Sequence, residues 1–286
     1  MTRVGFIGLG NMGAPIARRL VQAGLDPIVF DQSEAALQKL AEAGARTAAS
    51  CAGVAAEADM IGVCVRDDAD VEAAVLGVDG VLGAAKEGSL VALHSTILPT
   101  TVSRVAAAAA EGGVGVVDAT VTGGAMGAEK GQLTYMVGGA AEDVERCRPV
   151  FEASAKTIIH TGALGSGATA KLCLSITTYL GFLAAFEATM LATKAGVAAP
   201  AFENVLRSAG VMTDNLAAFV RMRLVADERS EDEALQAMLR NFTDLAEKDL
   251  ATALTLAREQ GVALPGAGLC QQLMARVYGV KDENRR

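Results

Sequence analysis

Short runs of β-branched and apolar residues alternate with helical patterns through the first half of the chain. The helical stretches have recognisable ends. Ser33 is expected to cap a helix over 34–43 that Gly44 ends, and Pro99 to open a helix that ends at 112–113. This alternation predicts an α/β fold with a parallel, doubly wound sheet. The strands expected in it are Arg3–Gly8, Pro27–Asp31, Met60–Val65, Ser89–Leu93 and Val114–Asp118.

The pattern changes after Gly165. Before this point the sequence predicts strand 133–137, helix 141–153 and strand 157–160; beyond it, apolar helical periods continue to about Tyr278 without a convincing strand. The first of these helices, Ala168–Ala195, would be about 40 Å long at 1.5 Å per residue. We therefore predict two domains, a sheet domain at 1–163 and an all-helical domain at 164–286.

Composition narrows the classes of function. The net charge is −8, aromatic residues make up 4% and tryptophan is absent, which disfavours binding to nucleic acid or to an anionic membrane. Two long charge-free stretches, 88–103 and 172–186, fall short of the roughly 20 apolar residues that span a bilayer. The N-terminus begins directly with a strand pattern, so a cytoplasmic location is expected. Five scattered cysteines predict neither disulfides nor a structural metal.

A glycine-rich segment, GLGNMG at 8–13, lies between the first strand and an amphipathic helix. Gly8 permits a tight turn, Gly10 allows the backbone to approach a pyrophosphate, and Gly13 lets helix and strand touch, while amides at the helix N-terminus face the anion. This context predicts a Rossmann-type dinucleotide site. Its expected cofactor-binding residues are Gly8, Gly10, Asn11, Met12 and Gly13.

Asp31 follows the second strand, 23 positions after Gly8. A carboxylate there can accept both ribose hydroxyls of an adenosine and would repel a 2′-phosphate, so the sequence favours NAD over NADP as the cofactor. Asp31 could instead only cap the helix that begins near Ser33, and the two roles are compatible.

Five segments together resemble the β-hydroxyacid dehydrogenases, a family that includes 3-hydroxyisobutyrate dehydrogenase and the tartronate semialdehyde reductases and is related to 6-phosphogluconate dehydrogenase. They are GLGNMGAPIARRL at 8–20, HSTILP at 94–99, DATVTGGAMGAEKGQLTYMVGG at 118–139, GSGATAK at 165–171 and EKDLATAL at 247–254. The resemblance extends over nearly the whole chain.

Thr122, Gly123 and Gly124 follow a predicted strand, and exposed backbone amides at such a place can bind a carboxylate. The resemblance implies that these residues hold the carboxylate of a small-molecule substrate. Alternatively, they form a plain glycine turn. The chain has Thr120 where the family usually has proline.

Lys171 stands near the start of the long helix, before fifteen residues without a charge. From the residues alone, it is either a lysine that reaches solvent at a helix end or a general acid/base. The resemblance implies the second role. Many family members carry a substrate-binding asparagine four positions later, where this chain has Ser175. Ser175 is thus expected to line the substrate pocket and to alter its specificity. Its side chain is shorter than that of asparagine and carries one hydrogen-bond donor.

The resemblance also implies that Thr96 and Lys248 contact the cofactor. Lys248 could instead belong to an exposed charge cluster. His94, which alternation places on the same side of its strand as Thr96, is a rival acid/base, and His160 is a weaker one. Asn241 replaces a phenylalanine that is frequent seven residues before the family's lysine.

The function expected is hydride transfer between NAD and a small 3-hydroxy acid or the corresponding semialdehyde. Two alternatives remain: an imine reductase, whose sequences commonly lack the lysine, and a dinucleotide-binding protein without efficient turnover. The apolar length of the helix at 168–195 predicts a homodimer or homotetramer formed through the helical domain.

Overall fold

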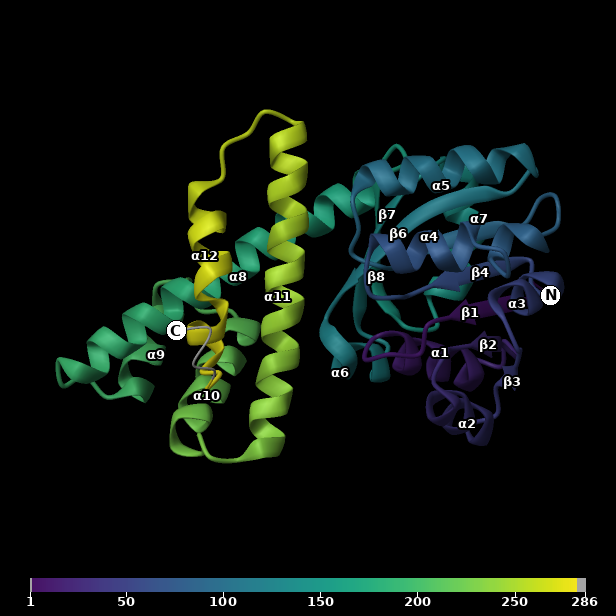
Figure 1. The fold of residues 1–286 in the computed structure, drawn as a ribbon. Helices are drawn as coiled ribbons and strands as arrows, with labels where there is room; N and C mark the ends of the chain where they lie inside the picture. Colours follow the sequence, from purple (N-terminus) through teal and green to yellow (C-terminus); the bar gives the residue numbers. More distant parts are fainter. Residues whose placement is uncertain (1, 282–286) are drawn as a thin grey trace. The chain divides into compact units, whose positions relative to one another are not determined.

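The computed structural model describes residues 2–281, and the chain divides into two compact units, 1–171 and 172–286. The first contains an eight-stranded sheet with the order β3-β2-β1-β4-β5-β6-β7-β8 (Figure 1). Parallel pairing dominates, as expected for a doubly wound fold. The strands are β1 (Val4–Ile7), β2 (Ile28–Phe30), β3 (Arg46–Thr47), β4 (Met60–Val63), β5 (Leu90–Leu93), β6 (Gly115–Thr122), β7 (Leu133–Gly138) and β8 (Ala155–Gly162).

One pair departs from the predicted parallel sheet, because β6 and β7 run antiparallel, with Thr122 opposite Thr134. Their connection holds only the short helix α6 (Gly124–Glu129) and a few turn residues. A parallel return needs a crossover of a dozen or more residues, so this link is too short for one. β6 also continues to Thr122, beyond the end predicted at Asp118.

Helices cover both faces of the sheet. Both faces are apolar, because successive strand residues point to opposite sides. In β5, Leu90 and Ala92 belong to the core under one helical layer, and Val91 and Leu93 belong to the core under the other. The first layer consists of α1 (Gly13–Gln22), α2 (Glu34–Glu42), α6 and α7 (Ala141–Phe151); the second consists of α3 (Cys51–Glu57), α4 (Asp68–Leu76), the 3₁₀ turn η1 (Val81–Gly83) and α5 (Pro99–Glu111).

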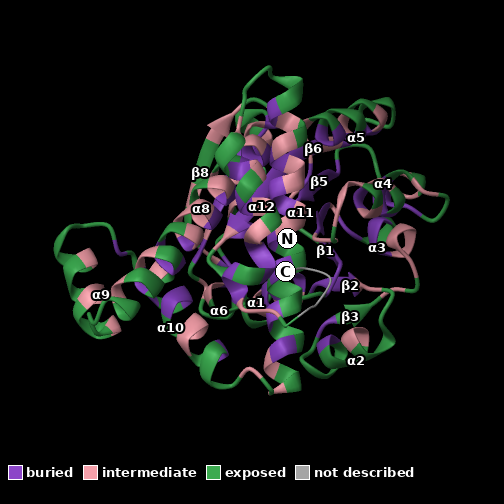
Figure 2. Ribbon diagram, turned by 60° about the vertical axis from the view of Figure 1, so that its left-hand side comes forward, coloured by how far each residue is buried: buried purple, intermediate pink, exposed green. Residues whose placement is uncertain are grey.

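The second unit contains helices and no strand among its described residues, as predicted. Its core is aromatic, with the rings of Phe182 and Phe219 stacked 4.2 Å apart. One helix, α9, has no buried residue (Figure 2). The helices are α8 (Ser166–Lys194), which begins in the first unit, α9 (Ala199–Ser208), α10 (Asp214–Glu228), α11 (Glu233–Glu259) and α12 (Pro265–Tyr278).

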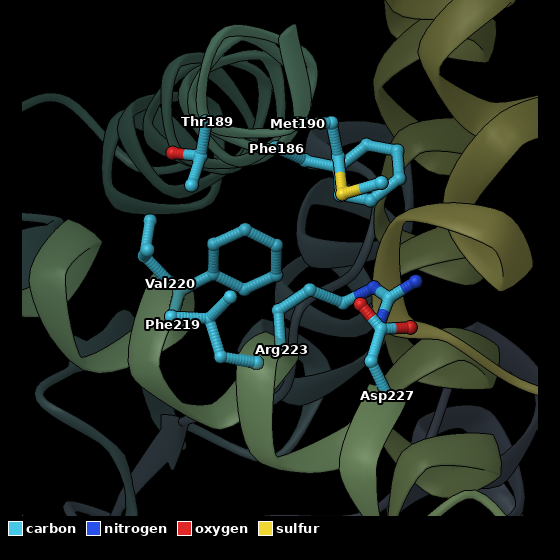
Figure 3. A pocket seen from close by; sticks show the side chains of 8 residues that line it. Phe186, Thr189, Met190, Phe219, Val220, Arg223 and Asp227 are labelled. Atoms are coloured by element: carbon cyan, nitrogen blue, oxygen red, sulfur yellow. The ribbon is translucent and has the colours of Figure 1, made fainter. Parts of the chain in front are cut away.

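A pocket in this unit lies between side chains of α8 and α10 (Figure 3). The guanidinium of Arg223 stands 5.0 Å from the ring centre of Phe186 and pairs with Asp227 at 2.5 Å. Gly279 leaves room for it, since a Cβ there would come within 2.9 Å of Arg223. None of the residues predicted for the functional site lines this pocket.

The predicted domain boundary at 163 precedes α8, and the two compact units divide within this helix, after Lys171. The reason is that the first turn of α8 packs on the sheet, where Ala168 is fully buried in the core. Within residues 2–281, α8 is also the single helix long and apolar enough to cross a membrane by length and composition. Core helices of soluble proteins meet the same criterion, so composition alone does not make α8 a membrane span.

Candidate active site

The glycine turn between β1 and α1 has the geometry of an anion cradle. Gly8 has φ +90°, and a Cβ there would lie 2.3 Å from the carbonyl oxygen of Cys64. A Cβ on Gly13 would lie 1.8 Å from the carbonyl oxygen of Gly8, so helix and strand touch at that point. In contrast, a Cβ on Gly10 would meet nothing within 4 Å. The backbone is therefore tightly packed at both ends of the turn and open in the middle.

The N-terminus of α1 complements this open stretch. No side chain caps the helix at Met12, and its first turn contains no acidic residue. Gly10 and Asn11 are exposed. Because helix N-termini favour anions, the turn fits the pyrophosphate of a dinucleotide.

Asp31, half-buried after β2, is tied to the same turn. Its Oδ2 accepts the backbone N–H of Leu9 at 2.6 Å, and its Oδ1 accepts that of Ser33 at 2.7 Å. Ser33 itself caps α2, since its hydroxyl accepts the N–H of Ala36. Asp31 is thus not the helix cap. A carboxylate has about four lone-pair positions, so two remain for further donors.

Thr122 ends β6 and stands half-buried at the carboxyl edge of the sheet, the edge that also carries the glycine turn. Gly123 and Gly124, both exposed, have φ +123° and +67°, which side chains rarely adopt. A Cβ on Gly124 would meet nothing within 4 Å, and α6 begins there without a side-chain cap. The turn therefore presents open backbone at a helix start.

The side chain of Lys171 comes to this turn. Its Nζ donates to the carbonyl oxygen of Val121, the residue before Thr122, at 3.0 Å. Lys171 also lies close enough to Cys64, whose carbonyl packs on Gly8, to act on that thiol's pKa, although burial dominates and raises it to about 12. The structure thus brings Lys171 together with Thr122, the two glycines and the edge of the glycine turn.

Two residues that were not predicted as part of the site hold the start of α8 against β6. The carboxylate of Asp118, 1% exposed, accepts the backbone N–H of Gly165 and of Ala168, each at 2.7 Å. The hydroxyl of Thr120, fully buried, donates to the carbonyl of Gly167 at 2.9 Å. The available signal was a carboxylate in an apolar strand, which needs partners if it is buried.

Thr96 lies half-buried after β5, which ends at Leu93 as predicted, so neither His94 nor Thr96 is on the strand where alternation placed them. His94, in contrast, points inward: it is 5% exposed, stacks on Phe6 at 5.6 Å, and its Nδ1 contacts the carbonyl of Ala119 at 2.7 Å. Burial lowers the pKa of His94 to about 4, so the ring is neutral at physiological pH. A ring that is buried and neutral is a structural element of the core, poorly placed to compete with Lys171 for proton transfer.

The other predicted residues belong to the second unit. Ser175, 4% exposed on α8, donates to Oδ2 of Asp249 on α11 at 3.2 Å. The Nζ of Lys248 lies 2.9 Å from Oδ1 of the same carboxylate. Asp249 is 2% exposed and also raises the pKa of Tyr179, after the larger effect of burial. Ser175 and Lys248 are therefore joined through one buried acid.

Comparisons with known proteins identify the family of the chain. Residues 3–162 match the NAD binding domain of 6-phosphogluconate dehydrogenase, and residues 165–284 match the NAD-binding family of NADP-dependent 3-hydroxyisobutyrate dehydrogenase. The chain belongs to the β-hydroxyacid dehydrogenase family. It is an oxidoreductase of this family with a pyridine-nucleotide-binding domain.

Individual relatives are similar over most of the chain. An uncharacterized oxidoreductase of Mycobacterium tuberculosis is 38% identical over 97% of this chain and 94% of its own. The NAD-dependent L-serine dehydrogenase of Pseudomonas aeruginosa is 39% identical over 72% of this chain and 70% of its own. The solved 3-hydroxyisobutyrate dehydrogenase of M. tuberculosis with L-serine has a TM-score of 0.81 at 30% identity, covering 96% and 93%. An imine reductase from Pseudomonas sp., 20% identical with a TM-score of 0.65 over 97% and 95%, shares the fold alone.

Proposed function

We propose that the protein transfers hydride between NAD and a small 3-hydroxy acid or the corresponding semialdehyde, with Lys171 as the general acid/base. The observation that carries this proposal is the position of the Lys171 Nζ, 3.0 Å from the carbonyl oxygen of Val121 and next to the turn at Thr122–Gly124. An amine held at the carboxyl edge of a doubly wound sheet stands where such folds bind ligands.

The proposed chemistry assigns each group a task. The backbone amides of Gly123 and Gly124, with the hydroxyl of Thr122, bind the substrate carboxylate. The bound nicotinamide cofactor supplies the hydride or accepts it. Lys171, protonated, donates to the carbonyl oxygen during reduction; neutral, it accepts the hydroxyl proton during oxidation. Thr96 and Lys248 are proposed to contact the cofactor.

We propose NAD as the preferred cofactor. The support is Asp31, whose half-exposed carboxylate is already oriented by the amides of Leu9 and Ser33 at the glycine turn. Two further lone-pair positions suit two ribose hydroxyls, whereas a 2′-phosphate would place negative charge beside the acid.

The substrate side has one distinctive residue, Ser175. Its hydroxyl donates to Asp249, so toward a substrate it would act as an acceptor, unlike the amide that many relatives carry. The similarity to an L-serine dehydrogenase and to a 3-hydroxyisobutyrate dehydrogenase makes L-serine and 3-hydroxyisobutyrate the first compounds to test.

The test is a panel of 3-hydroxy acids with NAD⁺ and NADP⁺, followed by absorbance of the reduced cofactor, with cyclic imines and the reduced cofactors assayed in parallel. We expect turnover of a hydroxy acid with NAD⁺. Reduction of imines alone would support the imine reductase alternative, which otherwise has only the shared fold in its favour. Tight NAD binding without turnover of any compound would support a protein that only binds the dinucleotide.

We also propose a homodimer or homotetramer formed through the helical unit. Three apolar side chains at the end of α8 and in the residues after it are exposed: Leu191 is 72% exposed, and Val205 and Val211 are 58% exposed. Exposed apolar groups of this number favour an interface. Light scattering at micromolar concentration is expected to give a multiple of the 29.2 kDa chain mass, and a monomer would contradict the proposal.

A further inference from the structure

Four hydrogen bonds join three residues of β6 to segment 165–171, which contains the start of α8. From β6, Asp118 accepts from Gly165 and Ala168, and Thr120 donates to Gly167. The next residue of β6, Val121, accepts from the Nζ of Lys171. The lysine is therefore at the end of a segment, 165–171, that is fixed at its beginning.

The backbones make direct contact at this point. A Cβ on Gly167 would lie 2.5 Å from the carbonyl oxygen of Met136 and 2.7 Å from that of Asp118. A Cβ on Gly138 would lie 2.5 Å from Oδ1 of Asp118. Glycine at both positions lets the helix lie directly on β6 and β7, so a small rotation of α8 would disturb several contacts at once.

The carboxyl group of Asp118 accepts hydrogen bonds at the start of a helix. Its pKa is raised overall, because burial outweighs the backbone N–H donors, those of Gly165 and Ala168 first among them, that lower it. Its two oxygens satisfy two amides that a helix start leaves without helical partners. A carboxylate at a helix N-terminus also interacts favourably with the helix dipole. Asp118 therefore caps the N-terminus of α8 from strand β6. Because it accepts two N–H groups at fixed places, it constrains the rotation of α8 about the helix axis.

Thr120 adds a hydrogen bond that a proline at its position could not make. It occupies the position where the resembled family usually has proline, and proline has no side-chain donor. Its hydroxyl donates to Gly167 at 2.9 Å and lies 3.4 Å from the carbonyl of Met136. The bond from Thr120 therefore constrains Gly167, which lies one residue before Ala168 and four before Lys171.

We propose that Asp118 and Thr120, together the β6 clamp, are positioning residues that hold the amine of Lys171 at the turn formed by Thr122–Gly124. This inference rests on the proposed role of Lys171. Neither side chain of the clamp is available to a ligand, since Asp118 is 1% and Thr120 0% exposed. They act through the backbone of 165–168.

The test uses the full-length protein with NAD⁺ and either L-serine or 3-hydroxyisobutyrate. Thr120→Val keeps the shape and removes the donor, and about 1 kcal/mol for one net hydrogen bond predicts a kcat lowered about fivefold with KM within twofold. Thr120→Ser retains the hydroxyl and should restore kcat.

Asp118→Asn places donors opposite backbone N–H groups, and a displacement of the Lys171 amine by about 1 Å can lower kcat about 100-fold. The matched control is Thr243→Val, equally buried and bonded to the carbonyl of Leu239 on α11, which should leave kcat unchanged.

A double-mutant cycle separates positioning from general damage. In the Lys171→Ala background no amine remains to be positioned, so Thr120→Val and Asp118→Asn should lower kcat no further. Equal losses in both backgrounds would overturn the inference. If Lys171→Ala itself keeps wild-type turnover, the proposed function fails, and this result is distinct from failure of the clamp.

A second measurement needs neither substrate nor turnover. Amide hydrogen exchange across 165–171 should become faster in Thr120→Val and return to the wild-type rate in Thr120→Ser, while exchange in α1 stays unchanged. Wild-type exchange in this segment for both Thr120→Val and Asp118→Asn would show that the clamp does not hold α8, and would overturn the inference regardless of activity.

Discussion

Two turns at the carboxyl edge of the sheet, β1–α1 and β6–α6, use open glycine backbone in different ways. At the first, the open backbone at Gly10 and the uncapped helix start at Met12 both belong to one segment, 8–13. At the second, the turn at Thr122–Gly124 is joined by an amine fifty residues away, Lys171. An anion cradle can thus be encoded in one short segment, whereas an acid/base group has to be brought in by tertiary structure.

Of the substitutions that test this contrast, removal of the Lys171 side chain should have the largest effect on turnover. Lys171→Ala is expected to lower kcat by about 10²- to 10⁴-fold, since a well-placed general acid contributes that much. The NAD dissociation constant should hardly change, because the glycine turn is intact. Steady-state kinetics and a binding titration measure the two. Lys156→Ala, an exposed lysine on β8, is the control, and wild-type turnover in Lys171→Ala would refute the assignment.

Experiments on His94 test whether Lys171, at the second turn, is the acid/base group of the proposed reaction. Its pKa is about 4 in the folded protein against 6.5 ordinarily, so the unfolded chain binds a proton between these values and the folded chain does not. The free energy of unfolding should therefore be unaffected above pH 6.5 and fall by up to about 3 kcal/mol as pH decreases to 4. Urea unfolding across this range measures the slope.

His94→Gln should reduce that slope, because glutamine does not titrate. It should also retain most of the activity, since the buried ring takes no part in the proposed reaction. A loss of kcat comparable to that of Lys171→Ala would transfer the acid/base role to His94 and contradict the assignment.

The glycine turn can be tested with two matched substitutions. Gly13→Ala puts a Cβ 1.8 Å from a backbone oxygen and should lower the free energy of unfolding by about 1–3 kcal/mol. Gly10→Ala meets nothing within 4 Å in the protein and should leave stability unchanged, yet weaken NAD binding about tenfold by obstructing the pyrophosphate. Denaturant unfolding and calorimetric titration distinguish them. Unchanged NAD affinity in Gly10→Ala would argue against an anion at this place.

Asp31 tests the choice between NAD and NADP. Asp31→Ala removes the proposed ribose acceptor, so NAD affinity is expected to fall about tenfold while NADP affinity falls less or rises. The ratio of the two kcat/KM values reports the change. An unaltered ratio would mean that Asp31 only orders the turn through Leu9 and Ser33.

Much of the fold could be predicted because its signals are local. Strand and helix alternation, the glycine spacing and the change of pattern near Gly165 indicated the doubly wound sheet and the helical region. The antiparallel pairing of β7 was missed because it depends on the length of the link after β6, a feature that hydrophobic periodicity does not report.

The site was less accessible to sequence reasoning, because its contacts are distant along the chain. Alternation placed His94 beside Thr96 on a strand, but the strand ends at Leu93 and the imidazole packs into an aromatic core. Nothing local joins Asp118 to Gly165, forty-seven residues later. Nor did spacing reveal that the hydroxyl of Ser175 is already donated to Asp249.

The proposed reaction depends above all on proton exchange between the amine of Lys171 and the substrate oxygen. A crystal structure of the wild-type protein with NAD⁺ and L-serine tests this exchange most directly. We expect the Nζ of Lys171 within about 2.6–3.2 Å of the substrate hydroxyl, with the carboxylate on the amides after Thr122. A hydroxyl bound by another group, with this amine directed away from it, would contradict the proposal.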